Sequence, residues 1–236
     1  MTSIGIISAC FGRTGIFEIF ASGVQRLRQE TGFDIPCVVA GDIGGADVCH
    51  EYGIEHIEFP NKPLTGKFNR ACQELKDRVD YVMISGTDNL LSTKTFQMIQ
   101  AEAEKGIDLI GLNDVYFYGM DGIQSGKFIY FGTTKVLGVG RTVSSRVLDQ
   151  IDWKPWRVDR DRGIDTVMLD SVRDLVKTSV LLEGGFVVDL KTSWNLNRID
   201  FWAERKDVKF VDPSLLFDNI GEEEIRLIRE FIDKQK

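Results

Sequence analysis

Residues 4–29 contain the stretch of sequence that decides the fold. It begins with an apolar run of strand length, IGIISA (Ile4–Ala9), and continues through a glycine-containing turn, CFGRTG (Cys10–Gly15). It ends in an amphipathic stretch, Ile16–Gln29, whose apolar residues recur at helical spacing. A buried strand that leads through a short turn into a helix is typical of a β–α–β unit.

The same alternation continues to residue 112. Further strands are expected at Ile35–Ala40, Ile54–Phe59, Tyr81–Ser85 and Leu109–Leu112. The intervening helices are expected at Ala46–Tyr52, Phe68–Lys76 and Thr95–Lys105, the last with Ser92 as its N-cap. The pattern predicts an α/β fold with a mainly parallel, Rossmann-like sheet flanked by helices.

The second half of the chain is less regular. Strands are expected at Tyr116–Tyr118 and Phe128–Phe131, helices at Ser144–Gln150, Ile164–Leu175 and Glu222–Asp233, and a hairpin-like break at Gly184-Gly185 within Val180–Leu190. No repeat or clear linker is present. We expect one domain over residues 1–236, with residues 1–115 and 116–236 as its two halves.

Composition excludes several classes of protein. The chain has 236 residues, of which 43% are hydrophobic and 28% charged, as in an ordinary globular protein. It has no apolar run long enough for a membrane span, and its start does not resemble a signal peptide. Its four cysteines are scattered, so neither a disulfide framework nor a structural zinc site is expected. A cytoplasmic location is the expectation that follows.

Charge is unevenly distributed along the chain. The net charge of −7 is unlike that of a typical nucleic-acid-binding protein. Residues 122–148 nevertheless contain four basic side chains and no acidic one, and residues 153–162 add four more basic side chains. This basic stretch either meets a polyanion or forms a solvated face.

Ser85–Leu91 reads SGTDNLL and follows an expected strand directly. Asp88 offers a carboxylate and Asn89 a carbonyl oxygen, which are ligand types for a hard divalent cation. Such a cation would neutralise a diphosphate leaving group. The alternative is a turn that caps the next helix.

Two other strand ends offer groups for a nucleotide. In Pro60–Ala71 (PNKPLTGKFNRA), Gly66 allows a tight turn and Lys67 opens a helix, an arrangement that favours phosphate. The alternative is a surface loop with a solvated lysine. This stretch is not a P-loop, and CFGRTG lacks the full dinucleotide fingerprint. Asp42 either accepts hydrogen bonds from a base or ribose, or caps a turn.

The second half offers further candidates. Asp165, in GIDTVMLD (Gly163–Asp170), is a catalytic base or a partner of the helix dipole. Arg141 follows a glycine-rich turn and is a candidate for binding an anion. Trp153 and Trp156 either stack on an acceptor or pack in the core. Lys191, after an apolar strand, is expected to close the site near the phosphates.

In this order the motifs resemble those of the nucleotide-diphospho-sugar glycosyltransferases of the A-type fold, and most closely the compact enzymes of phage genomes. The resemblance covers about residues 4–197. It implies a nucleoside pocket at Ala9, Cys10, Phe11, Arg13 and Asp42, diphosphate and ribose contacts at Lys67 and Asn69, and a metal motif at Asp88 and Asn89 beside Thr87. The implied metal is Mn²⁺ or Mg²⁺, and Asp165 falls where such enzymes often place the acid that activates the acceptor.

Two departures from this family stand out: Asn89 replaces the usual second acidic residue, and no histidine follows His56. The resemblance implies transfer of a sugar from a nucleotide-diphosphate donor, UDP-sugar first, to an acceptor hydroxyl. The favoured acceptor is 5-hydroxymethylpyrimidine in phage DNA, within the host cytoplasm, with Arg141, Trp153 and Trp156 as its contacts. The alternatives are a glycan or lipid-linked sugar as acceptor, or a non-catalytic nucleotide-sugar-binding module. A nucleotidyltransferase would need a longer loop after the first strand.

Overall fold

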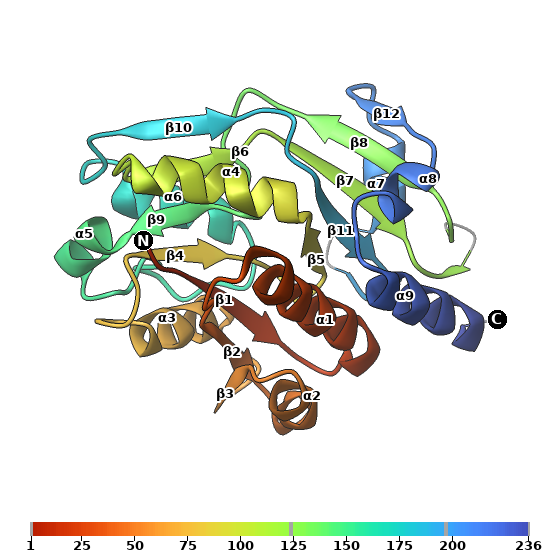
Figure 1. The fold of residues 1–236 in the computed structure, drawn as a ribbon, viewed down its shortest axis with the longest axis horizontal. Coiled ribbons are helices and arrows are strands. Elements are labelled where there is room, and N and C mark those ends of the chain that lie inside the picture. Colours follow the sequence, from red (N-terminus) through yellow and green to blue (C-terminus); the bar gives the residue numbers. More distant parts are fainter. Residues whose placement is uncertain (1, 123–124, 196–197, 236) are drawn as a thin grey trace.

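The computed structural model describes residues 2–122, 125–195 and 198–235, which form two β-sheets with helices packed around them (Figure 1). The larger sheet has seven strands in the order β10-β6-β9-β4-β1-β2-β3. These strands are β1 (Ile4–Cys10), β2 (Cys37–Gly41), β3 (Glu55–Glu58), β4 (Tyr81–Ile84), β6 (Leu109–Leu112), β9 (Thr142–Ser144) and β10 (Ser179–Leu182). Their neighbours pair in parallel, except around β9, which is antiparallel to β4 and β6.

The helices of the described residues connect these strands and complete the chain. They are α1 (Thr14–Thr31), α2 (Ala46–Glu51), α3 (Leu64–Glu74), α4 (Thr93–Glu104), α5 (Ser145–Leu148), α6 (Ile164–Val172), α7 (Ile199–Ala203), α8 (Ser214–Phe217) and α9 (Glu222–Lys234). The strands and helices expected in the first half of the chain are confirmed, except that α3 begins earlier than predicted. Within the described residues, no helix combines the length and apolar character that crossing a bilayer requires.

The side chains of β1 show why helices cover both faces of the larger sheet. Successive residues of a strand point to opposite faces. Ile4 and Ile6 pack in the core beneath α1 and α4, whereas Ile7 packs in a second core with α3, α5 and α6. A strand buried on both faces needs a continuous apolar run, which is the pattern that predicted it.

The smaller sheet has five strands in the order β12-β8-β7-β11-β5. They are β5 (Asn89–Leu91), β7 (Asp114–Gly119), β8 (Phe128–Gly132), β11 (Val187–Lys191) and β12 (Val208–Phe210). Residues of α1, α8 and α9 pack against this sheet in a third apolar cluster. The chain enters the smaller sheet soon after β4, since only residues 85–88 separate β4 from β5.

The expected hairpin around Gly184-Gly185 is wrong. β10 pairs with β6 at the edge of the larger sheet, whereas β11 pairs with β5 and β7 in the smaller one. The chain therefore crosses between sheets at these glycines instead of folding back on itself. Glycines mark sharp turns of either kind, so the sequence alone does not tell a crossing from a hairpin.

The buried side chain of Arg26 joins α1 to α9, α4 and β5. Arg26 of α1 pairs with Glu224 of α9 at 2.6 Å, and it also donates to the Thr93 hydroxyl and the Leu91 carbonyl at 2.6 Å each. Glu224 is 1% exposed. Because α9 meets α1 at this pair, the ion pair helps to fix the last helix of the chain.

Replacing Glu224 with alanine is therefore expected to lower the free energy of unfolding by about 3 kcal/mol, since it removes the buried carboxylate and leaves the guanidinium only the half-exposed Glu30, 3.6 Å away. Urea unfolding followed by circular dichroism measures this change. The matched control is Glu223→Ala, which removes a surface partner of Arg226 and should have little effect. Equal losses in the two variants would contradict the assignment.

Candidate functional site

An open cleft of about 760 Å³ lies between the two sheets, at the carboxyl ends of β1 and β4. Its volume falls in the range of small-molecule sites. Ten of the predicted site residues line it: Ala9, Cys10, Phe11, Arg13, Lys67, Thr87, Asp88, Asn89, Asp165 and Lys191. Asp42 lines a small adjoining pocket with Cys10–Thr14. Asn69, Arg141, Trp153 and Trp156 line neither.

The small pocket forms where the turns after β1 and β2 meet. Gly12, with φ of 60°, donates its N–H to Asp42 Oδ2 at 3.2 Å, and His56 Nε2 lies 3.0 Å from the Asp42 carbonyl oxygen. Burial raises the pKa of Cys10 to about 11, and the neighbouring Asp42 adds to the rise. Cys10 is therefore a neutral thiol in this wall, while Phe11 is 52% exposed beside it.

Lys67 lies in the first turn of α3 and points into the cleft wall. The helix begins at Leu64, so the expectation that Lys67 opens it is wrong. Gly66 packs close to Phe59 and Pro63 and makes no left-handed turn. The Lys67 ammonium donates to the Cys10 carbonyl at 2.8 Å and to Asn61 Oδ1 at 3.2 Å, and burial lowers its pKa.

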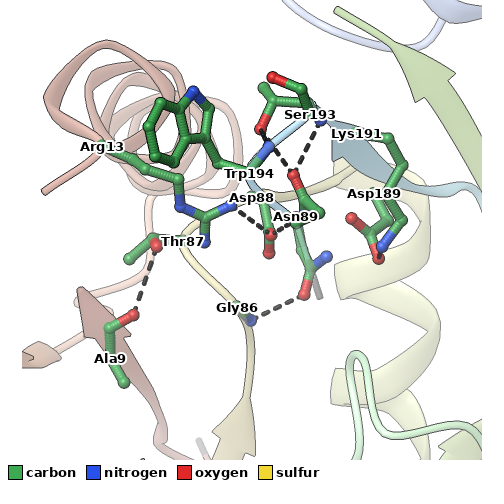
Figure 2. A network of polar contacts seen from close by, with 12 residues as sticks. Ala9, Arg13, Gly86, Thr87, Asp88, Asn89, Asp189, Lys191, Ser193 and Trp194 are labelled. Atoms are coloured by element: carbon green, nitrogen blue, oxygen red, sulfur yellow. Dashed lines mark hydrogen bonds and ion pairs between the residues drawn. The ribbon is translucent and has the colours of Figure 1, made fainter. Parts of the chain in front are cut away.

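Residues 86–89 form a tip between β4 and β5. Arg13 Nη1 lies 3.2 Å from Asp88 Oδ2 (Figure 2). Asn195 Nδ2 donates to the same oxygen at 2.8 Å. Asn89 turns back, and its Oδ1 accepts the Gly86 N–H at 2.7 Å. Thr87 donates to the Ala9 carbonyl at 3.3 Å, so the tip is tied to the end of β1.

Asp189 is a cleft residue that the sequence analysis did not single out. It lies on β11 opposite Asn89 in the strand pairing, and its Oδ2 accepts from the Lys191 ammonium at 2.6 Å. Its Oδ1 is buried and lacks a hydrogen-bond partner. Burial raises the pKa of Asp189 to about 7, against the opposing effect of Lys191. The sequence feature that could have identified Asp189 is the presence of two charged residues, 189 and 191, on one face of an otherwise apolar strand.

Asp165 lies exposed in the first turn of α6 and lines the cleft. Its carboxylate packs so close to the backbone of Gly138 that a Cβ atom there would collide with it. The Asp165 carbonyl, not its carboxylate, accepts from Arg141 Nη1 at 2.9 Å. The carboxylate is therefore available at the cleft surface.

Arg141 is a core residue, which corrects its expected role in binding an acceptor. It is 1% exposed and contacts the Asp165 carbonyl and the Met168 sulfur. Burial lowers its pKa to about 10. A guanidinium enclosed in this way anchors the start of α6 and does not reach a ligand in the cleft.

The two tryptophans and Asn69 are also structural. Trp153 and Trp156 are 1% and 3% exposed, so neither ring offers a face to an acceptor. Asn69 donates to the Trp156 carbonyl at 2.7 Å and accepts the Trp156 N–H at 3.1 Å. Both polar atoms of this side chain are thus used to hold residue 156, which corrects its expected contact with a donor.

The basic stretch over residues 122–162 is exposed only in part. Arg141 is buried, Arg146 pairs with the buried Asp108, and Lys127 directly precedes β8 in the smaller sheet. The four basic side chains of residues 153–162 are exposed. Contact of this stretch with a polyanion stays a prediction.

Family models give no match to the sequence, and comparison with curated proteins gives none either. Solved structures do match. TarS of S. aureus (residues 1–349) superimposes with a TM-score of 0.56 at 10% identity, over 80% of this chain and 60% of that one. Mannosyltransferase PcManGT of Pyrobaculum calidifontis, in complex with GDP-Man and Mn²⁺, gives 0.55 at 9% identity, over 83% of this chain and 59% of that one.

A third match is 4-diphosphocytidyl-2C-methyl-D-erythritol synthase of Anaerococcus prevotii, with a TM-score of 0.51 at 9% identity, over 78% of this chain and 87% of that one. The chain therefore spans less than two thirds of the first two proteins and most of the third. At 9–10% identity these likenesses concern the fold alone. They confirm the predicted class, a Rossmann-like α/β sheet flanked by helices, as in nucleotide-sugar-binding proteins of the A-type glycosyltransferase fold.

Proposed function

We propose that this protein is a glycosyltransferase that uses a nucleotide-diphosphate sugar as donor. The observation that carries the proposal is the cleft at the carboxyl ends of β1 and β4, whose lining includes the cations Arg13, Lys67 and Lys191 and the carboxylate of Asp165. Ligands of open α/β sheets bind at this edge. The likeness to a mannosyltransferase complexed with GDP-Man supports the same interpretation.

The donor fits the cleft with its nucleoside toward the small pocket. Phe11 offers an exposed ring for a base, and Asp42 offers a carboxylate oxygen beside the Gly12 backbone. The diphosphate then meets the cations Arg13 and Lys191, and the sugar points toward Asp165. In this placement the donor extends along the cleft from the small pocket after β1 and β2 toward α6.

Asp165 is the acceptor-activating base in this proposal. The acceptor hydroxyl attacks the anomeric carbon, its proton passes to the Asp165 carboxylate, and the sugar–oxygen bond to the diphosphate breaks with both electrons on the diphosphate oxygen. Asp165 is exposed beside the Gly138 backbone at the cleft surface, so an acceptor hydroxyl can reach its carboxylate. A direct displacement with Asp165 as the base inverts the anomeric configuration.

A nucleotidyltransferase is the second candidate, because the third matched protein is named as the synthase of a diphosphocytidyl compound. The loop after β1 argues against it. Only Phe11–Arg13 separate β1 from α1, which leaves no room for the longer glycine-rich basic loop that this class would need. The short loop therefore favours glycosyl transfer.

The acceptor is better matched by a carbohydrate than by DNA. Of the basic stretch that favoured DNA, Arg141 is buried and Arg146 pairs with Asp108, whereas Trp194 lines the cleft and is 84% exposed. Hydrogen bonds connect the residues on either side of it, because Asn195 Oδ1 accepts from the Thr192 N–H at 2.8 Å and from its hydroxyl at 2.9 Å. An exposed aromatic ring offers a sugar a broad contact surface. A glycan or lipid-linked sugar is thus the proposed acceptor.

UDP and GDP, and their sugars, are expected to raise the melting temperature, because a ligand that binds only the folded state stabilises it by mass action. A thermal-shift titration with each compound, in Mn²⁺ and in EDTA, measures the effect. A rise in either condition supports the proposal. No rise with any nucleotide in either condition would overturn it.

Asp165→Asn is expected to reduce turnover by at least ~100-fold while leaving nucleotide binding unchanged, since the variant removes a proton acceptor but no cation. The assay follows UDP or GDP released from the donor sugar, with water or a sugar as acceptor. The matched control is Asp170→Asn, an exposed carboxylate of the same helix that pairs with Arg173 outside the cleft. Similar turnover in the two variants would refute the role of Asp165.

The charge of Asp189 matters because it holds Lys191 in the cleft. Burial raises the pKa of Asp189 from its ordinary value of 3.8 to about 7. Between these values the folded chain binds more protons than the unfolded chain at this site. The contribution of Asp189 to stability therefore falls as the pH rises from about 4 to about 7.

Asp189→Asn, which cannot titrate, is accordingly expected to gain melting temperature relative to the unmodified protein as the pH rises from about 5 to about 8. Thermal unfolding across this range gives the difference at each pH. Asp170→Asn is again the control, and its difference should show no such rise. A difference for Asp189→Asn that is flat or falls with pH would contradict the raised pKa.

A further inference from the structure

The donor atoms at the tip do not suit a divalent cation. Mg²⁺ and Mn²⁺ take hard oxygen ligands, carboxylates above all. In the part of the chain that the structure describes, no group of three or more acidic, histidine or cysteine side chains is placed to hold a metal ion. Asp88 is the only carboxylate of the tip, and Asn89 stands beside it.

One oxygen of each of the two side chains of the tip is already engaged by the chain. Asp88 Oδ2 accepts from Arg13 at 3.2 Å and from Asn195 at 2.8 Å. Asn89 Oδ1 accepts the Gly86 N–H at 2.7 Å and so closes the turn. A metal ion bound through these two oxygens would have to displace a guanidinium and an amide from Asp88 and open the turn at Asn89.

The second carboxylate of the cleft floor, Asp189, is also paired through one oxygen, while its Oδ1 has no hydrogen-bond partner. Asp189 Oδ2 lies 2.6 Å from the Lys191 ammonium, which is buried and also lies 5.3 Å from the centre of the Phe117 ring. In Figure 2, Asp189 and Lys191 lie beside Asn89 on the side away from Arg13. Each carboxylate of the floor thus holds a cation from the chain itself. The residues present do not fit the Mn²⁺ or Mg²⁺ that the sequence led us to expect.

We infer that Arg13 and Lys191 bind and neutralise the diphosphate of the donor, so that transfer needs no divalent cation. The inference rests on the proposed function. A guanidinium pairs with two phosphate oxygens at once, and an ammonium acts as a compact charge. Arg13, with a side chain 30% exposed, is accessible from the cleft, and Asp88 holds it there before the donor arrives.

The chemical step balances with these residues alone. The bond from the anomeric carbon to the diphosphate oxygen breaks, and its electron pair stays on that oxygen. The acceptor oxygen forms the new bond to the same carbon and gives up its proton to Asp165. The diphosphate gains one negative charge, which Arg13 and Lys191 offset at the oxygens where it develops.

The test is nucleotide binding with and without metal. The protein is stripped with EDTA, and UDP and GDP are titrated by calorimetry in EDTA and in Mn²⁺, with Mn²⁺ alone as a further titrant. The expected dissociation constants in the two conditions agree within about twofold, and Mn²⁺ alone shows no saturable site.

Arg13→Gln is expected to weaken binding in EDTA by about tenfold or more, since it removes a charge-assisted contact. The matched control is Arg157→Gln, which removes the same charge from an exposed position outside the cleft lining and should leave binding unchanged. Circular dichroism at rest and on heating shows whether both variants fold.

The outcomes separate this inference from the function beneath it. Nucleotide binding that appears only with Mn²⁺ overturns the inference and leaves the glycosyltransferase proposal standing. Unchanged binding by Arg13→Gln overturns it as well. Failure of every nucleotide to bind in both conditions overturns the proposed function, and the inference with it.

Discussion

The passage of the chain from β4 into β5 is the constraint on which the cleft depends, because it joins the two sheets over a few residues. Its first end is tied to the larger sheet, where Ser85 N–H donates to the Ile7 carbonyl at 3.1 Å. Its far end is tied to the smaller sheet, where Leu190 N–H donates to the Asp88 carbonyl at 2.7 Å. With both ends fixed, the side chain of Asp88 is presented to the loops that carry Arg13 and Asn195.

The same passage explains why residue 89 is an asparagine. Asn89 is the cross-strand partner of Asp189, and like charges directly opposite in an antiparallel pair are destabilising. An aspartate at 89 would oppose Asp189 and also lie next to Asp88. The amide closes the turn on Gly86 without adding charge. The asparagine at position 89, where the family usually has an acidic residue, therefore avoids a second negative charge beside the buried Asp189–Lys191 pair.

Local periodicity predicted β1, β2, β3, β4 and β6 of the larger sheet, most of which are buried on both faces, but not the antiparallel β9. The same signal placed the ends of β1 and β4, and with them Arg13, Thr87 and Asp88, at one edge. It did not predict the smaller sheet, whose strands pair over long sequence separations, such as β5 with β11. Asp189 was missed because the pairing of β11 with β5, and not its neighbours along the chain, places it beside Asn89 in the cleft. Residue type alone misled where burial depends on tertiary packing, since Arg141 and Trp156 looked like surface groups for an acceptor, yet both are enclosed beside α6.

The charges of the cleft floor form a system that can exchange partners. Arg13 and Lys191 balance Asp88 and Asp189 before a ligand binds, so no cation stands exposed without a partner at this floor among the contacts described. When a diphosphate takes the two cations, each carboxylate loses its counter-charge. Asp88 keeps the Asn195 amide as a donor, and Asp189, whose pKa is already about 7, can take up a proton near neutral pH. Because burial disfavours the charged form of Asp189, its carboxylate can take up a proton when Lys191 leaves it for the diphosphate.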